Sequence, residues 1–456
     1  MVVDVCILGG GLAGLYAAYL LQRLGLKIVI FEREERPGGL LKSINLDGYV
    51  FDMGGSHVIF SKNKEVLNQI LNLIPGGIIR HYRNSRIYYG GKYIKYPFEN
   101  SLYQLGPQER YECLRDFINA LVRRAKGEFK TPKNFTEWCY QTFGESICNK
   151  YLIPYNEKIW KVSTDELSST WVAGRVPNPP IDDVIKAATG IPTEGYKHQL
   201  NFYYPMSGGI ESLVRGIIGS FNSNVTLKLR AEVSKVRKEN DLYIVKVGSD
   251  EYLCKKVIST IPLPELLNRL PHNDIPKELR DLIPKLAYTS LIVVGVGGKP
   301  KNPYGFHWIY FPQLEIPFHR LAILSNYSKS MAPKGKISLI AEVSFKPNDR
   351  IDVNDLIDQS LDYLDKLGFI RRDDTECVTY KVWRYAYILH NHNYEYVRKT
   401  LIKFLDNYGI VTLGRFGSWK YLNMDQVILE VSNMLKSKVL SNVEKRSPPT
   451  VISRYF

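Results

Sequence analysis

Apolar positions near the start of the chain predict a strand, a helix and a second strand. Residues 2–8 and 27–31 are short apolar runs, which are typical of strands buried in a parallel sheet. Between them, residues 12–24 are apolar at helical spacing, and Gly25 stands where a glycine commonly ends a helix. The chain therefore opens with a β-α-β unit.

The pattern farther along predicts two other kinds of region. Residues 108–166 have apolar positions at helical spacing and predict a helical insertion. Gly90-Gly91 predicts the turn of a hairpin over 87–94. Strand-like runs without long helices between them predict a separate antiparallel sheet over 286–296, 307–311, 319–324, 337–345 and 377–385. A return to the first sheet is expected through strands over 226–233, 242–247, 257–260 and 410–413 and a last helix over 425–439.

The loop between the first strand and the first helix has the pattern GxGxxG. Gly9 allows a tight turn, Gly11 lets backbone approach a pyrophosphate, and Gly14 lets the helix pack closely on the strand. Leu12 and Ala13 open the helix, whose N-terminus offers N–H groups to phosphates.

Glu32 closes the second strand and can accept hydrogen bonds from both hydroxyls of an adenosine ribose. Its negative charge disfavours a 2′-phosphate, so the ligand is FAD or NAD rather than NADP. The alternative to a dinucleotide-binding loop is a glycine turn in some other kind of α/β unit.

Two more glycine turns distinguish FAD from NAD. They lie at 36–40, including Gly39 and Leu40, and at 52–57, including Gly55 and Ser56. A plain NAD-binding unit would continue into another crossover helix, whereas glycine pairs let backbone pass close to a flat ring. The arrangement resembles the FAD family that includes amine oxidases, protoporphyrinogen oxidase and UDP-galactopyranose mutase. The resemblance implies an extended FAD with the His57 loop beside the flavin.

Composition and charge limit the partners. The chain has 456 residues and a net charge of +15, but its basic residues are dispersed, which favours a nucleotide ligand over nucleic acid. The cysteines are scattered without metal-ligand or disulfide spacing, so no metal is expected. No run is long enough to span a bilayer and no signal-peptide pattern is present, so we expect a cytoplasmic protein without stable membrane insertion. A homo-oligomer is left open.

Five stretches resemble UDP-galactopyranose mutase, particularly its eukaryotic-type branch. They lie at 96–100, 154–160, 171–176, 310–328 and 414–421, and the resemblance covers nearly the whole chain. It implies a flavin-dependent isomerase that interconverts UDP-galactopyranose and UDP-galactofuranose through a flavin N5–sugar adduct of reduced FAD. NADH and NADPH are candidate reductants. The alternative is an FAD-dependent oxidoreductase of the amine-oxidase or protoporphyrinogen-oxidase type.

The same resemblance implies roles for individual residues. Arg175 and Arg320 match the cations that stabilise the departing diphosphate, although both could instead be surface arginines paired with acids. His57 matches a histidine close to the flavin, although it could equally be a satisfied loop residue. The other substrate-contacting residues implied are Tyr96, Asn156, Trp160, Asn201, Tyr387 and Tyr421.

Further cofactor contacts are implied in the middle of the chain and near its C-terminus. Arg415 fits an arginine beside flavin N1 and O2, Asp425 and Gln426 begin the last helix, and Val233 is expected to contact the cofactor. The chain departs from the family pattern at Ser56, which separates the glycine pair from His57. It departs again at 386–388, where Ala-Tyr-Ile replaces Gly-Tyr-Pro. These departures affect the identity of the sugar nucleotide more than that of the cofactor.

The predicted fold class is α/β. It combines a Rossmann-type FAD-binding domain with a helical insertion domain and an antiparallel β-sheet substrate domain. We expect the FAD-binding domain to be discontinuous, at 1–85, 203–265 and 405–456. The helical substrate domain is expected at 100–195 and the sheet domain at 86–99 and 285–404.

Overall fold

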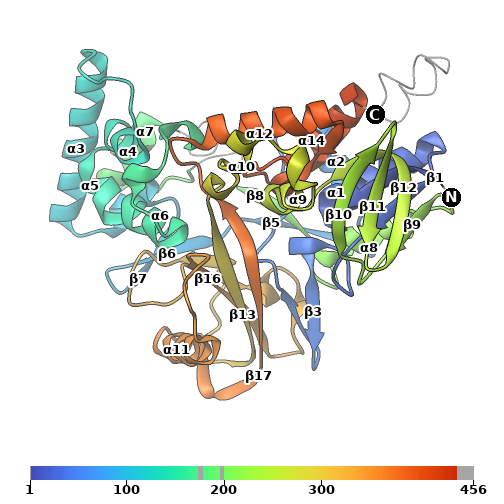
Figure 1. The fold of residues 1–456 in the computed structure, drawn as a ribbon. Coiled ribbons are helices and arrows are strands. Elements are labelled where there is room, and N and C mark those ends of the chain that lie inside the picture. The colour runs from blue at the N-terminus through green and yellow to red at the C-terminus, as the bar shows by residue number, and fades with distance from the viewer. Residues whose placement is uncertain (1, 173–177, 196–199, 439–456) are drawn as a thin grey trace.

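The computed structural model describes residues 2–172, 178–195 and 200–438. Figure 1 shows a mostly parallel sheet on one side of the molecule, a group of helices on the other, and a second sheet below them. The predicted α/β fold class is confirmed. The predicted domain boundaries remain predictions.

The first sheet is the dinucleotide-type sheet. Its strand order is β10-β11-β12-β1-β2-β9, with β18 also pairing β12. Strands β1, β2, β9, β12 and β18 run parallel where they pair, while β10 and β11 form an antiparallel extension. The strand bounds are Val2–Leu8 (β1), Ile28–Phe31 (β2), Val225–Lys228 (β9), Val233–Glu239 (β10), Leu242–Val247 (β11), Asp250–Ser259 (β12) and Ile410–Thr412 (β18).

Helices cover both faces of this sheet because alternate residues of its strands are buried on opposite sides. Ile7 and Ile30 pack with the first cover and Cys6 and Val29 with the second. The first cover is α1 (Leu12–Leu21), α8 (Glu211–Gly219) and α14 (Met424–Lys438), with α2 (Lys64–Asn72) beside α14. The second is α9 (Leu263–Leu267) and α12 (Tyr394–Tyr408).

The second sheet has the order β17-β13-β16-β15-β14-β6-β7. Its neighbours pair antiparallel except β14 and β6, which are parallel. Gly90 and Gly91, both at positive φ, make the β6–β7 turn. Helix α11 (Val353–Lys366) packs on one face through Leu356, Leu361 and Leu364. The strand bounds are Ser85–Tyr89 (β6), Lys92–Lys95 (β7), Tyr288–Pro300 (β13), Trp308–Tyr310 (β14), Arg320–Ile323 (β15), Ile337–Phe345 (β16) and Ile370–Ile388 (β17).

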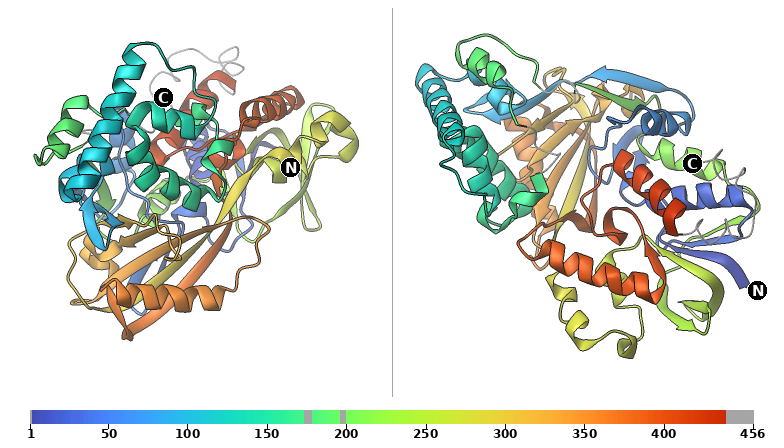
Figure 2. Two further views of the ribbon diagram at one scale, coloured as in Figure 1. Left: turned by 90° about the vertical axis from the view of Figure 1, so that its left-hand side faces the viewer. Right: turned by 90° about the horizontal axis from the view of Figure 1, so that it is seen from above.

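The helical region has its own apolar core, which includes Phe117, Phe135, Phe143 and Val184. A π-helical turn at Cys148–Leu152 leads directly into α6. The helices are α3 (Pro107–Ala125), α4 (Phe135–Phe143), α5 (Glu145–Ile147), α6 (Ile153–Trp160) and α7 (Ile181–Ala188). Figure 2 shows that this group projects beside the second sheet rather than over the first.

Short elements join these regions. Two strand pairs, β3 with β4 and β5 with β8, form small sheets of their own, and α13 (Gly414–Gly417) follows β18. The bounds of these strands are Ser43–Leu46 (β3), Tyr49–Asp52 (β4), Ile78–Tyr82 (β5) and Asn201–Pro205 (β8). A further short helix, α10, spans Lys277–Arg280.

Two details differ from the sequence prediction. The strand expected over 226–233 is two strands, because the chain turns at Arg230 with φ +52° before Val233 begins β10. Helix α12 was not predicted, although Val397, Leu401 and Leu405 lie one helical turn apart. The C-terminal end beyond Lys438 lies outside the described residues.

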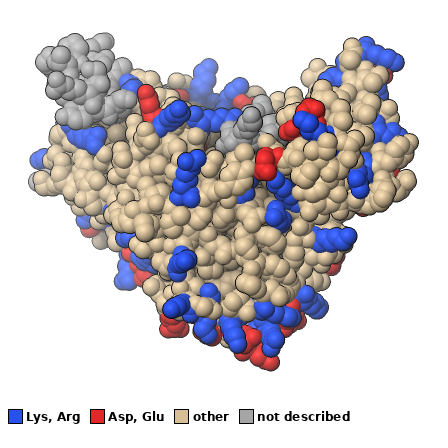
Figure 3. All heavy atoms as spheres, turned by 180° about the vertical axis from the view of Figure 1, so that it is seen from behind, with Lys and Arg blue, Asp and Glu red and all other residues tan. Residues whose placement is uncertain are grey.

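Positive charge is dispersed over the surface. Figure 3 shows Lys and Arg scattered over one face, with Asp and Glu among them. Within the described residues, no helix combines the length and apolar character needed to cross a membrane.

Candidate functional site

A cavity of about 460 Å³ extends from the glycine loop of the first sheet to β15 and β17 of the second. Its wall brings together residues that are far apart in the sequence. The predicted site residues that line it are Gly9, Gly11, Leu12, Ala13, Glu32, Gly39, Leu40, Ser56, His57, Tyr96, Asn201, Val233, Arg320, Tyr387, Arg415 and Tyr421.

The glycine loop has the geometry that its sequence predicted. Gly9 has φ +99°, and a Cβ on Gly14 would lie 2.1 Å from the carbonyl oxygen of Gly9. A Cβ on Gly11 would meet no atom within 4 Å, so this position faces open space at the start of α1. Gly14 is therefore required by packing, whereas Gly11 leaves room for a ligand.

Glu32 lies at the end of β2 with its carboxylate fixed by backbone. Its Oε2 accepts a hydrogen bond from the N–H of Gly10 at 2.8 Å, and its Oε1 accepts one from Glu34 at 2.9 Å. Each carboxylate oxygen keeps further acceptor capacity. The side chain is thereby oriented for hydroxyl donors at the cavity wall.

The second glycine turn packs against the first, and the third packs against the second, by backbone contact. The N–H of Gly38 donates to the carbonyl of Gly10 at 2.8 Å, and a Cβ on Gly39 would lie 3.4 Å from the Cα of Gly11. A Cβ on Gly54 would lie 1.8 Å from the carbonyl oxygen of Leu40. The absence of side chains here lets the three turns meet at one edge of the cavity.

His57 lies on the loop after these turns. Its Nδ1 is 3.1 Å from the carbonyl oxygen of Gly55. Burial lowers the pKa of His57 to about 4, and the nearby positive charges of Arg415 and Arg320 act in the same direction. The imidazole is therefore neutral at pH 7.

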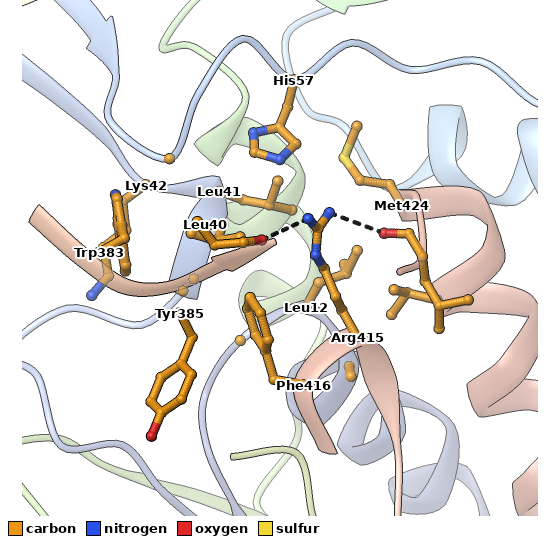
Figure 4. A pocket seen from close by; sticks show the side chains of 18 of the residues that line it. Leu12, Leu40, Leu41, Lys42, His57, Trp383, Tyr385, Arg415, Phe416 and Met424 are labelled. Atoms are coloured by element: carbon orange, nitrogen blue, oxygen red, sulfur yellow. Dashed lines mark hydrogen bonds between the residues drawn. The ribbon is translucent and has the colours of Figure 1, made fainter. Parts of the chain in front are cut away.

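Arg415 extends from α13 into the cavity below the ring of His57 (Figure 4). It donates to the carbonyl oxygens of Ala386 at 2.6 Å and Leu422 at 3.4 Å, and it lies 4.3 Å from the centre of the Tyr421 ring. Its Nε is buried and has no hydrogen-bond partner among the described residues. A donor of this kind is suited to an acceptor supplied by a ligand.

Arg320, the first residue of β15, is held by Glu342 on β16. Its Nε and Nη2 donate to the two carboxylate oxygens at 2.7 and 2.5 Å, and Glu342 is fully buried. Burial alone would raise the pKa of Glu342, but Arg320 outweighs it and lowers that pKa to about 2. Glu342 also accepts the backbone N–H of Ser56 at 2.9 Å, so it joins the His57 loop to Arg320.

Sequence reasoning did not identify Glu342. The available signal was a single acid within the apolar run 337–345, where an unpaired charge would be costly to bury. The match to family motifs covered Arg320 but not the strand that pairs with it.

The residues expected to contact substrate on α6 bond to each other. Trp160 Nε1 donates to Asn156 Oδ1 at 3.0 Å, one helical turn away. The Trp160 ring lies 5.8 Å from Tyr387 and 5.7 Å from Tyr421 between ring centres. The three rings form an aromatic cluster, Trp160, Tyr387 and Tyr421, in which the two tyrosines line the cavity and Trp160 packs behind them.

Tyr96 and Asn201 lie on another part of the wall. The ring of Tyr96 is 5.0 Å from that of Tyr310, and Arg83 lies 4.9 Å from the centre of the Tyr96 ring. Asn201 begins β8 and accepts a hydrogen bond from Arg80 at 3.3 Å.

Some predicted site residues do not line the cavity. Gly14 and Gly55 pack against neighbouring groups, and Asn156 and Trp160 lie behind the wall. Asp425 accepts a hydrogen bond from Ser61 at 2.8 Å, and Gln426 accepts one from the backbone N–H of Asn423 at 3.0 Å. Both therefore position the start of α14. Arg175 lies outside the described residues.

The residues present fit an extended dinucleotide cofactor. Gly11 to Ala13 at the N-terminus of α1 would hold the pyrophosphate, and Glu32 would hold the ribose. Arg415, with its unpartnered Nε, would meet the ring system near His57. Within the described residues, no group of His, Cys, Asp or Glu forms a metal site.

The fold and the cavity together place the protein in the class of dinucleotide-binding flavoproteins. The family described as flavin containing amine oxidoreductase matches residues 12–398, and the chain belongs to it. Membership of this family implies FAD as the cofactor.

Solved structures with a similar fold are named for different activities. A crystal structure of reduced UDP-galactopyranose mutase superposes with a TM-score of 0.87 at 25% identity, covering 100% of this chain and 97% of that one. A putrescine oxidase structure superposes with a TM-score of 0.66 at 16% identity, covering 96% and 99%, which supports the fold alone.

Curated sequence relatives match over shorter parts. Amine oxidase A of Sus scrofa is 25% identical over 64% of this chain and 55% of its own length. An inactive all-trans-retinol 13,14-reductase of Danio rerio is 37% identical over 16% of this chain and 12% of its own length. The chain thus spans about half, or much less, of the length of these relatives.

Proposed function

We propose that the protein is a mutase that interconverts UDP-galactopyranose and UDP-galactofuranose, with FAD in its reduced form. The similarity over the whole chain to a reduced UDP-galactopyranose mutase supports this proposal. The observation that carries it is Arg320, a guanidinium fixed on the cavity wall beyond the His57 loop. In this reaction the reduced cofactor supplies the nucleophile for the anomeric carbon of the sugar.

We assign Arg320 to the diphosphate of the substrate. Glu342 engages Nε and Nη2, which leaves Nη1 without a protein partner among the described residues. A guanidinium held in this way can donate to phosphate oxygens without reorganising as the diphosphate departs. A preorganised donor of this kind lowers a barrier by about 3 kcal/mol. Arg175 is assigned as the second cation.

The two tyrosines of the aromatic cluster are assigned to the same diphosphate. Burial, with a further contribution from Glu342, raises the pKa of Tyr387, so its hydroxyl stays protonated. The hydroxyl donates to Glu342 at 3.4 Å and would turn to a phosphate oxygen when the substrate is bound. Tyr421 stacks on Arg415, which joins this part of the wall to the flavin part. We assign Arg415 to the negative charge of the reduced flavin, next to a neutral His57.

The alternative function is that of an FAD-dependent oxidoreductase of the amine-oxidase or protoporphyrinogen-oxidase type. The name of one curated relative, amine oxidase A, favours it. In that case Arg320 would only pair with Glu342, and a nucleoside diphosphate would have no site.

Titration of the FAD-loaded protein with UDP, followed by calorimetry, separates these functions. We expect binding to the wild type and about 30-fold weaker binding to Arg320→Ala, since a hydrogen bond to a charged group contributes about 2 kcal/mol. Arg237→Ala is the matched control, because Arg237 forms a surface pair with Glu251 far from the cavity wall. Equal affinities in wild type and Arg320→Ala, or no UDP binding at all, would favour the oxidoreductase.

A further inference from the structure

Lys158 is a buried cation on α6 that the site described above does not use. Only 3% of its surface is exposed, and it stands between Asn156 and Trp160 on the same helix. On a helix, residues two positions apart point in different directions. Asn156 and Trp160 share one face of α6, and Lys158 extends from another.

The ammonium group of Lys158 is held by backbone carbonyls. Its Nζ donates to the carbonyl oxygens of Phe311 at 2.9 Å, Gln313 at 2.6 Å and Phe318 at 2.8 Å. An ammonium has three donors, so these bonds account for all of them. Within the described residues, no carboxylate lies within ion-pair distance of Lys158.

The carbonyls belong to the loop 311–318, which joins β14 to β15. This loop begins next to Tyr310 and ends just before Arg320, and both of these residues line the cavity. The base of the loop is closed by the N–H of Phe311, which donates to the carbonyl of His319 at 2.9 Å. Lys158 therefore bonds to the inside of a loop whose end carries the cation assigned to the diphosphate.

The ammonium group of Lys158 is costly to bury. Desolvation lowers the pKa of Lys158 to about 7, with Lys161 acting in the same direction and Glu315 opposing it. A buried lysine without an acid partner is uncommon, and its hydrogen bonds to carbonyls are what offset the loss of water. An apolar residue would fill the same space without that cost, but it could not hold the loop.

We propose that Lys158 is a positioning residue for the active site, fixing α6 to the loop 311–318 so that Trp160 supports the two tyrosines of the cavity wall that also carries Arg320. Helix α6 packs against the second sheet at β16, and Figure 1 shows it at the side of the helical group nearest that sheet. Lys158 is the bond between the two regions at this point. The proposal rests on the proposed function for the identity of the ligand, but not for the geometry.

Lys158→Met is the first test, because it keeps the length of the side chain and removes the donors. We expect FAD content close to that of the wild type, UDP binding about tenfold weaker, and kcat for UDP-galactofuranose about 100-fold lower, the scale expected when reacting groups are misplaced by about 1 Å. Lys158→Arg keeps the charge but has a planar fork, so we expect it to recover only part of the loss.

Lys150→Met is the matched control. Lys150 belongs to the turn before α6 and pairs with Glu112 on α3, away from the cavity. We expect its UDP affinity and kcat to match the wild type. If Lys158→Met lowers only the melting temperature and leaves UDP affinity and kcat unchanged, the residue is merely structural and the proposal fails. If Lys158→Met does not fold with FAD, the same comparison is made with Lys158→Arg and Lys158→Gln.

A crystal structure of the folded variant separates this inference from the proposed function. The inference expects α6 and Arg320 to shift relative to each other whichever ligand the cavity takes. Unchanged positions would overturn it even in an active mutase. A shift in a protein that never binds UDP would overturn the proposed function instead.

Discussion

Gly11 is a residue that the fold itself does not require to be glycine. Its φ of −78° is open to any residue, and an added Cβ would meet nothing within 4 Å. Gly9 and Gly14, in contrast, are required by the fold itself. The three glycines of one motif therefore serve different purposes, which the motif alone does not reveal.

The variant Gly11→Val tests this distinction. We expect a folded protein without bound FAD, because the new side chain occupies the space that a pyrophosphate needs. Far-UV circular dichroism measures the fold, and the ratio of flavin to protein absorbance measures the cofactor. Gly219→Val is the control, since a Cβ there also meets nothing within 4 Å but lies at the end of α8. Flavin retained at the wild-type ratio by Gly11→Val would contradict this placement of the loop.

At the scale of elements, Glu342 joins three segments that come from distant parts of the sequence. It lies on β16, pairs with Arg320 on β15 and accepts the N–H of Ser56 from the loop after β4. The carbonyl of Glu342 also accepts the N–H of His319 at 2.9 Å. Removing its charge would leave Arg320 partly buried without a counter-ion.

We predict that Glu342→Gln lowers the free energy of unfolding by about 3 kcal/mol, as expected when one partner of a buried pair is lost. Urea unfolding of the FAD-loaded protein measures this change. Glu251→Gln, which removes a surface partner of Arg237, should change stability by less than about 1 kcal/mol. Similar losses in both variants would show that Arg320 does not depend on Glu342.

Local signals predicted the local elements well. The glycine loop, the Gly90-Gly91 hairpin and the strands of the second sheet follow from short-range spacing and turn chemistry. Two other features depend on contacts between distant segments. They are the ion pair of Arg320 with Glu342 and the hydrogen bonds from Lys158 to the loop 311–318. A single sequence does not show which distant segments meet, so the roles of Glu342 and Lys158 were missed, whereas Arg320 was found because it lies in a family motif.

At the scale of the whole molecule, neutral buried histidines make stability depend on pH. Burial lowers the pKa values of His307 and His319 to about 4 and about 3, against 6.5 in an unfolded chain. Unfolding therefore takes up protons between about pH 4 and pH 6.5. The stability that these two neutral histidines contribute is present above pH 6.5 and is lost as the pH falls through this range, by up to about 1.4 kcal/mol per pH unit for each group.

The variant His319→Phe isolates one of these groups. We expect the free energy of unfolding to fall less steeply between pH 6.5 and pH 4.5 than in the wild type, by about 1.4 kcal/mol per pH unit. Denaturant titrations at several pH values measure the slope. His272→Gln, at an exposed histidine, should keep the wild-type slope. An unchanged slope in His319→Phe would mean that His319 is already protonated in the folded protein.

A pair of anaerobic incubations tests whether the protein isomerises a UDP-sugar with reduced FAD, as we propose. One sample holds dithionite-reduced protein with UDP-galactofuranose, the other holds oxidised protein, and chromatography separates the products. We predict UDP-galactopyranose from the reduced sample only. No conversion by reduced protein that carries FAD would contradict it.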